Sequence, residues 1–144
     1  MKVTEILRSK GADVITIWPG ASLRSAVERM AKRNVGALVV VDDEGKVVGM
    51  VSEREVVHAL AETGERALAE AVADLMPRRL ITCGPDDRLA DLMAVMTEHR
   101  VRHLPVVEDG RLVGLVSIGD LVKARLGELE LESNVLRDAY LRVR

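Results

Sequence analysis

The sequence is short of several residue types on which particular classes of protein depend. Its 144 residues include one cysteine, four prolines, one tryptophan, one tyrosine and no phenylalanine. The single cysteine, Cys83, cannot form an internal disulfide or a cysteine-based zinc site, which favours a reducing compartment. With so few aromatic rings, the chain cannot bind single-stranded nucleic acid by stacking bases on several of them. The hydrophobic core must therefore be built from aliphatic side chains.

The chain also lacks an excess of charge and a long apolar run. It has 21 Lys+Arg and 23 Asp+Glu residues, a formal net charge of -2, so no overall positive field attracts a polyanion. No segment approaches the roughly 18 apolar residues of a membrane span, and polar residues follow Met1 before any signal-peptide core could form. Hydrophobic residues make up 48% and charged residues 31%, which is typical of a globular domain. We therefore expect a cytoplasmic protein without nucleic-acid or membrane partners.

The sequence does contain an internal repeat. Residues 49–52, Gly-Met-Val-Ser, return 65 residues later at 114–117 as Gly-Leu-Val-Ser, and further upstream the spacing is 66 residues. The change of one residue falls in polar, glycine-containing turns at 42–45 and 108–110, where a change in length is well tolerated. The chain therefore consists of two related halves.

Hydrophobic periodicity predicts the same order of elements in both halves, namely strand, helix, hairpin and helix. In the first half we predict a strand at 14–17, a helix at 23–31, a hairpin of 37–41 with 46–51, and a helix from Ser52. In the second half we predict a strand at 80–83, a helix at 89–99, a hairpin of 104–107 with 111–116, and a helix from Ser117. The predicted fold class is therefore α/β, with two β-α-β-β-α repeats.

The two repeats should pack together with pseudo-two-fold symmetry around a shared core, because about 60 residues bury too little apolar surface to be stable alone. A three-residue difference separates Val3 and Val72 from the strands that follow them, which predicts a loop near Lys10. The expected division is residues 1–62 for the first repeat, 63–71 for a linker, 72–125 for the second repeat and 126–144 for a helical tail.

Three local motifs accompany this pattern: Leu-Pro-Val-Val at 104–107, the two Gly-x-Val-Ser segments, and an acidic residue three positions after each serine. Together they resemble the cystathionine-β-synthase (CBS) domain pair, also called a Bateman module, over residues 3–125. The resemblance implies a stand-alone regulatory module that senses a ligand and is not an enzyme. Its ligand is expected to be an adenosine-containing molecule such as AMP, ADP, ATP, NAD or S-adenosylmethionine, which is a regulatory ligand and not a cofactor.

The resemblance also implies where the ligand binds. In the family, an aspartate three residues after a serine holds the ribose, and Asp120 after Ser117 matches it. A carboxylate can accept hydrogen bonds from both ribose hydroxyls, while the helix N-terminus favours a phosphate. The residues implied for this first pocket are Thr16, Gly36, Ala37, Arg102, His103, Leu115, Ser117, Gly119 and Asp120.

A second, mirrored pocket is implied at Ser52, where Glu55 replaces the family's aspartate. The longer side chain moves the carboxylate outward, so we rank this pocket second, although Arg54 could bind a phosphate through two hydrogen bonds. The residues implied for the second pocket are Thr82, Ser52, Arg54 and Glu55, with Arg102 or His103.

Both serine motifs also have a purely structural interpretation. Ser52 with Glu55 has the spacing of a helix capping box, which needs no ligand. Ser117 with Asp120 is expected to be a poorer box, because the aspartate side chain is too short to reach back. Ser117, His103 and Asp120 could be drawn as a catalytic triad, but no Gly-x-Ser-x-Gly nucleophile elbow supports it.

Other reactive side chains indicate little chemistry. His58 and His99 have no metal-ligand spacing, so we expect no metal site, and Cys83 after a strand is interpreted as a small core residue. One group of basic residues stands out in a chain whose net charge is negative. Most such clusters are solvated faces, but if this one binds a ligand, it would suit nucleotide phosphates better than RNA or DNA. Its members are Arg78, Arg79, His99, Arg100, Arg102 and Arg111.

The tail after Asp120 has apolar residues at steps of three, four and seven, which places them on one face of a long helix. These residues are Val122, Leu126, Leu129, Leu136 and Tyr140. Gly64 interrupts the corresponding helix of the first repeat, so the tail is an addition to the repeat unit. We expect a homodimer in which the tail closes a disc of four repeats or packs on the neighbouring chain. The alternative for the tail is a helix folded back on its own module. The alternative for the function is a dimerisation or scaffold module with vestigial pockets. The sequence does not identify a protein target.

Overall fold

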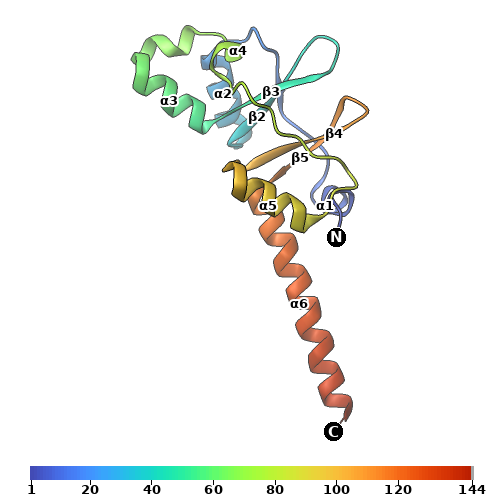
Figure 1. Ribbon diagram of the computed structural model, residues 1–144. Helices are drawn as coiled ribbons and strands as arrows, with labels where there is room; N and C mark the ends of the chain where they lie inside the picture. The colour runs from blue at the N-terminus through green and yellow to red at the C-terminus, as the bar shows by residue number, and fades with distance from the viewer. Residues whose placement is uncertain (144) are drawn as a thin grey trace.

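The computed structural model describes residues 1–143 and shows two α/β units, from which a long C-terminal helix extends (Figure 1). No helix in this part of the chain is both long and apolar enough to cross a membrane. The elements are α1 (Val3–Lys10), β1 (Thr16–Ile17), α2 (Leu23–Arg33), β2 (Ala37–Val41), β3 (Val47–Ser52), α3 (Glu53–Thr63), a 3-10 helix η1 (Gly64–Ala69), α4 (Val72–Leu75), α5 (Leu89–His99), β4 (His103–Glu108), β5 (Arg111–Ser117) and α6 (Ile118–Val143).

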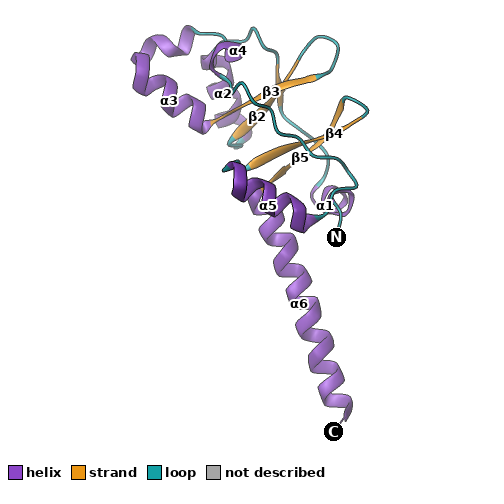
Figure 2. Ribbon diagram, viewed as in Figure 1, coloured by secondary structure: helices purple, strands orange, loops and turns teal. Residues whose placement is uncertain are grey.

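The predicted hairpins lie side by side at the centre of the molecule, with helices on the outer sides (Figure 2). In the first sheet β2 lies between β1, which is parallel to it, and β3, which is antiparallel. The second sheet contains only the antiparallel pair β4 and β5. An isolated antiparallel bridge between Lys46 and Arg111 joins the two hairpins. Both hairpins also shift register at the same place, after Val40 and after Val106.

One predicted strand is largely absent. Residues 80–83 were expected to form the first strand of the second repeat, but only Cys83 pairs with Val106, in an isolated parallel bridge. Its N–H donates to the carbonyl of Pro105 at 2.9 Å, and its carbonyl accepts from Val107 at 2.8 Å. Leu80 and Ile81 instead line a cleft, so this stretch does not continue the ladder.

The expectation of one shared core is wrong, because the buried side chains form two separate clusters. The cluster of the first repeat includes Ala67 and Val72, which follow that repeat in the sequence. The cluster of the second repeat includes Val3 and Ile6, from the start of the chain. Each core is therefore completed by a helix from outside its own β-α-β-β-α segment.

This exchange of helices follows the pseudo-symmetry of the sequence. The N–H of Val3 donates to the carbonyl of Asp87 at 2.9 Å, and the N–H of Val72 donates to the carbonyl of Ala21 at 2.8 Å. The following residues, Thr4 and Ala73, bond in the same way to the carbonyls of Pro85 and Pro19, both at 3.0 Å. The helices α1 and α4 thus occupy equivalent positions, each on the other repeat.

The exchanged helices explain the glycine of the Gly-x-Val-Ser motif. A Cβ atom on Gly114 would lie 2.8 Å from Leu7 Cδ1 and Cδ2, and a Cβ on Gly49 would overlap the sulfur of Met76. Both glycines are buried, and each leaves space for a side chain from the other repeat, which is Leu7 over Gly114 and Met76 over Gly49. The repeated glycine is therefore a packing requirement of the exchange.

The single cysteine is a core residue, as its position predicted. Cys83 is buried in the second cluster and forms no disulfide. Burial, with a smaller contribution from the charge of Asp87, raises the pKa of its thiol to about 12. At neutral pH the thiol is protonated, so it is a poor nucleophile.

The C-terminal tail is helical, as predicted. Helix α6 begins at Ile118, runs without interruption for 26 residues and points away from both units (Figure 1). Leu121 is fully buried against the second repeat, whereas the large apolar residues farther along are exposed. The alternative in which the tail folds back on its own module is therefore wrong.

Gly114→Ala tests the packing of the exchanged helix. We expect the added methyl group to destabilise the fold by about 1 kcal/mol, because it displaces the ends of the Leu7 side chain. The same substitution in a Leu7→Ala background should cost less, since the methyl group then fills vacated space. Urea unfolding of the four proteins in this cycle measures the coupling. Gly84→Ala, whose Cβ would make only ordinary contacts, is the control, and equal costs in both backgrounds would refute the explanation.

Candidate functional site

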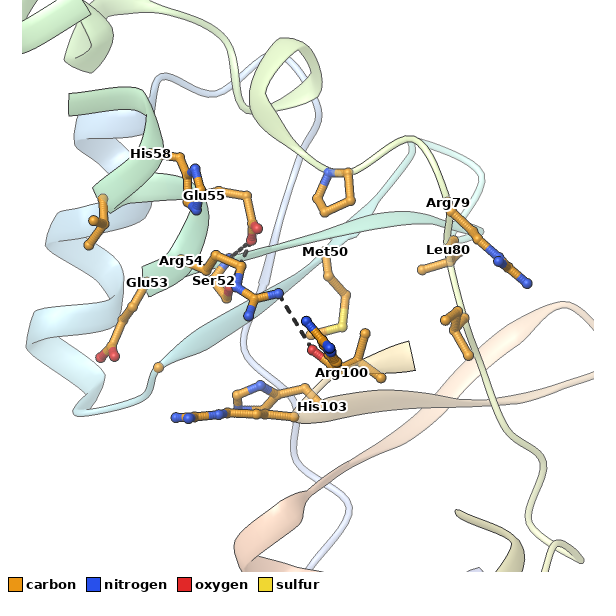
Figure 3. Close-up of a pocket in the computed structure, with 16 residues that line it drawn as sticks. Met50, Ser52, Glu53, Arg54, Glu55, His58, Arg79, Leu80, Arg100 and His103 are labelled. Carbon is orange, nitrogen blue, oxygen red and sulfur yellow. Dashed lines mark hydrogen bonds between the residues drawn. The ribbon is translucent and has the colours of Figure 1, made fainter. Parts of the chain in front are cut away.

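A cleft of about 490 Å³ lies between the two repeats (Figure 3). This volume is in the range of small-molecule sites, roughly 300 to 1,000 Å³. The cleft combines an apolar wall with a polar, mostly basic lining. The apolar residues are Met50, Val57, Pro77, Leu80, Ile81 and Val101, and the others are Gly36, Ser52, Glu53, Arg54, Glu55, His58, Arg79, Arg100, Arg102 and His103.

The acidic part of the cleft is the N-terminus of α3. Glu55 Oε1 accepts hydrogen bonds from the N–H of Ser52 at 2.8 Å and from the Ser52 hydroxyl at 2.7 Å. The structural interpretation of this motif as a capping box is therefore confirmed. Both bonds use Oε1, so the cap does not need the second oxygen of the Glu55 carboxylate. A hydroxyl-bearing ligand could be held there while the cap stays intact.

The basic part of the cleft contains four arginines, against two glutamates in the same lining. Arg54 and Arg100 come from different repeats and meet in the middle of the cleft (Figure 3), where Arg54 Nη1 lies 3.5 Å from the Arg100 carbonyl oxygen. Arg79 also lines the cleft, from the segment that leads into the second repeat, and its side chain points away from Arg54 and Arg100 (Figure 3). Guanidinium groups bind phosphate oxygens through paired hydrogen bonds, so the cleft suits an anion.

Arg100 has an unusual backbone conformation. It follows α5 with a φ of 54°, in the left-handed region, where asparagine and glycine are the common residues. Asn34, 66 residues earlier, has the same φ of 54° after α2. The first repeat thus places a favourable residue at this position, whereas the second places an arginine that reaches the cleft. Strained residues of this kind concentrate at functional sites.

His103 lies at the edge of the cleft, at the start of β4. Burial lowers the pKa of its imidazole, the positive charges of Lys10 and Arg102 lower it further, and the carboxylates of Asp120 and Glu53 oppose them. The ring is therefore neutral at pH 7. The neutral ring can donate one hydrogen bond and accept one there, but it contributes no positive charge to the cleft.

The Ser117–Asp120 motif has a different environment. Asp120 Oδ2 accepts from the N–H of Ser117 at 2.8 Å, and the N–H of Asp120 donates to Ser117 Oγ at 3.2 Å. The expectation that aspartate is too short for this box is wrong, because the extended serine backbone brings its N–H within reach. Lys10 Nζ also donates to Asp120 Oδ2, at 2.6 Å, and to the carbonyl of Leu115 at 2.8 Å. The carboxylate implied to bind ribose is therefore held by a lysine of α1.

The structure regroups the predicted site residues. Six of them line the cleft, namely Ser52, Arg54, Glu55, Gly36, Arg102 and His103. Gly36 was assigned to the Asp120 pocket but lies in the Ser52 cleft. The lining of this cleft does not include Thr16, Ala37, Thr82, Leu115, Ser117, Gly119 or Asp120. Of these, Ala37 is buried in the core and Thr82 is exposed.

Sequence reasoning did not assign Arg79, Arg100 and His58 to a site. Arg79 and Arg100 belong to the predicted basic cluster, so their charge was visible in the sequence. The second repeat has Arg100 at the position where the first repeat has Asn34, and this difference in the sequence could also have pointed to the site. The described residues contain no cluster of three or more His, Cys, Asp or Glu side chains that could hold a metal ion.

Comparison with known proteins assigns the fold to one family. The CBS domain family model matches twice, at residues 3–62 and 72–127. The chain therefore belongs to the CBS domain family and contains a CBS domain pair. Such pairs are regulatory ligand-binding modules, and the match indicates no catalytic family.

Particular relatives are similar over most of this chain. CBS domain-containing protein CBSX3, mitochondrial, of Arabidopsis thaliana is 34% identical over 147 residues, covering 96% of this chain and 71% of that protein. The crystal structure of a CBS-domain-containing protein from Agrobacterium tumefaciens has 40% identity and a TM-score of 0.83, covering 86% of this chain and 92% of that one. The CBS pair of protein MJ0100, in complex with 5′-methylthioadenosine and S-adenosyl-L-methionine, has 27% identity and a TM-score of 0.79, covering 89% and 98%.

Lys10→Met tests the ion pair that occupies Asp120. Burial alone would raise the pKa of Asp120, but the hydrogen bonds from Lys10 and Ser117 and the charge of Lys10 lower it below its ordinary value of 3.8. A lowered pKa adds stability above the ordinary value, and this stability is lost as the pH falls through the pKa of the folded state. Lys10→Met should therefore cost about 0.5–1 kcal/mol at pH 7, since the pair is partly exposed, and less at pH 3.

Urea unfolding at several pH values measures this difference. Lys2→Met is the matched control, because Lys2 lies 3.9 Å from Asp86 in a much more exposed pair and should matter little. A cost for Lys10→Met that does not change between pH 7 and pH 3 would show that the pair is not responsible.

Proposed function

We propose that this CBS pair is a regulatory module that binds an adenine nucleotide in the cleft between its repeats. The observation that carries the proposal is the composition of the cleft, which is lined by an apolar wall, a carboxylate at a helix N-terminus and four arginines. The adenosine-containing ligands of the MJ0100 pair support the choice of adenosine.

Each part of the proposed ligand has a matching part of the cleft. Met50, Ile81 and Val101 offer an apolar surface for the base, and the second oxygen of Glu55 can accept from ribose hydroxyls. Arg54, Arg79 and Arg100 supply donors for phosphate oxygens. We infer that AMP, ADP, ATP or NAD binds more tightly than S-adenosylmethionine, whose sulfonium group is repelled by the arginines.

The order of the two pockets is reversed in this proposal. Ranking from the sequence favoured Asp120 because aspartate matches the family pattern. Lys10 now competes for that carboxylate, whereas Glu55 faces an open cleft. A ligand at Ser117 and Asp120 remains a proposal for a second site, and it would require Lys10 to give up or share its hydrogen bond.

We also propose that the protein acts as a homodimer. Support comes from α6, which presents large exposed apolar side chains along a helix that leaves the module. Such a surface is unfavourable in water unless another surface covers it.

A thermal-shift panel of AMP, ADP, ATP, NAD, GTP and S-adenosylmethionine tests the nucleotide proposal. At about 100 times its dissociation constant, a ligand adds roughly 2.7 kcal/mol to the free energy of unfolding, so the melting temperature should rise by several degrees. Arg79→Gln should reduce the shift, whereas its exposed neighbour Arg78, which does not line the cleft, provides the matched control Arg78→Gln.

Each result of the panel has a defined meaning. A larger shift with S-adenosylmethionine than with ATP would overturn the argument from the arginines. If no nucleotide shifts the melting temperature, a dimerisation or scaffold module with vestigial pockets becomes the better description.

Arg100→Asn should separate stability from binding. Asparagine is tolerated in the left-handed conformation, so the variant should be more stable than the wild type by up to about 1 kcal/mol. It should also bind the nucleotide more weakly by about 1.5–3 kcal/mol, through loss of charged hydrogen bonds. Asn34→Gly, at the equivalent position outside the cleft, is the control and should leave affinity unchanged. Calorimetric titration and urea unfolding measure the two effects, and unchanged affinity in Arg100→Asn would exclude its role.

A further inference from the structure

The exposed side chains of α6 follow a seven-residue repeat. Apolar or small residues recur at alternating steps of four and three, beginning at Val122. In the a-to-g notation of coiled coils, position d is taken by Val122, Leu129 and Leu136. Position a is taken by Leu126, Ser133 and Tyr140. Leu126, Leu129 and Leu136 are 55%, 44% and 65% exposed. Only Ser133 departs from the apolar pattern, and a single polar residue at such a position commonly sets register.

This a/d face lies opposite the face that α6 turns to its own module. Leu121 is buried in the second core and Ala124 packs partly against it, at positions c and f of the same repeat. Positions c and f lie on the opposite side of a helix from a and d. A second helix can therefore pack along the a/d face while Leu121 and Ala124 keep their places in the second core.

The charged residues beside this face identify the partner and its direction. The charged g positions are Arg125 and Glu132, and the charged e positions are Lys123, Glu130 and Arg137. In a parallel coiled coil, each g residue faces the e residue five positions farther along the partner helix. Two identical helices would then pair Arg125 with Glu130 of the partner subunit and Glu132 with Arg137 of the partner subunit. Both contacts join opposite charges.

The antiparallel pair that overlaps the whole stripe is unfavourable. With Leu126 opposite Leu136 of the partner subunit, e residues face e residues and g residues face g residues. Glu130 then lies beside Glu130 of the partner subunit, and Glu132 beside Glu132 of the partner subunit. Like charges at these positions oppose pairing.

We propose that α6 pairs with α6 of a second copy of this chain as a parallel, in-register, two-stranded coiled coil. The apolar stripe supplies the core, and the two g-to-e contacts select the direction. Arg125 Nη1 lies 3.1 Å from Glu128 Oε2 within one chain, and the five donors of a guanidinium allow both contacts. The two CBS pairs then lie at the same end of the coiled coil. This inference rests on the proposed homodimer but does not depend on nucleotide binding.

Cysteine cross-linking tests the direction and register. Ser133→Cys places a thiol at an a position, where two parallel, in-register helices bring identical residues together, so mild oxidation should form an intermolecular disulfide in most chains. Asp138→Cys, at an f position on the outside, should remain monomeric on a non-reducing gel. The unmodified chain is a further control, because its only thiol, Cys83, is buried.

Charge reversal tests the proposed pairs. Glu130→Arg should weaken the dimer, because Arg125 then faces an arginine, and Arg125→Glu in the same chain should restore it. The antiparallel arrangement predicts no such rescue, since it exchanges one like-charge contact for another. Leu129→Glu should weaken dimerisation by about tenfold or more, whereas Leu131→Glu, at a more exposed position off the stripe, should leave it unchanged.

Sedimentation velocity of each protein separates the possible failures. A monomeric unmodified chain at micromolar concentration would overturn both the homodimer and the coiled coil. A dimer that does not cross-link through Ser133→Cys, or that tolerates Leu129→Glu, would overturn the coiled coil alone.

Discussion

The arrangement of the whole molecule depends on the exchange of two short helices between the repeats. Helix α1 completes the core of the second repeat and α4, with η1 before it, completes the core of the first. Each core is closed by buried valines that the chain supplies from outside the repeat, so neither repeat is complete alone. The exchange holds the two hairpins beside each other, and the cleft exists because they are held there. It also determines the buried glycines Gly49 and Gly114, over which Met76 and Leu7 pack.

The same exchange makes two pseudo-equivalent sites chemically different. Lys10, at the end of α1, reaches Asp120 and forms a short ion pair with it. Leu7 and Met76 are equivalent residues of the two exchanged segments, and the same separation in sequence makes Lys10 equivalent to Arg79. Arg79 lines the open cleft together with Glu55. The carboxylate of one motif is therefore paired with an internal cation, while the other motif lies in an open cleft with arginines in its lining. Arg100 adds to this difference, because it occupies a left-handed position where the first repeat has Asn34.

Helix α6 joins the second repeat to the surface that we propose for dimerisation. Its first turn contains the Ser117–Asp120 cap and packs on the second core, while its later turns carry the exposed apolar stripe. The contact with the second core and the exposed stripe use opposite faces of the helix, so the same residues do not serve both. In the homodimer that we propose, a change in the packing of the second repeat against α6 would be transmitted along this helix to the partner subunit.

The sequence by itself determined the features that depend on local patterns. The internal repeat, both hairpins, α2, α5 and the helical tail follow from hydrophobic periodicity, turns and capping residues, all of which act over a few positions. Tertiary structure decided the rest. The exchange of α1 and α4, the reduction of residues 80–83 to a single bridge, the ion pair of Lys10 with Asp120 and the entry of Arg100 into the cleft each join residues far apart in the chain. Periodicity records which side of an element is apolar, but not which distant surface it packs against, because that choice depends on shape and on the whole chain at once.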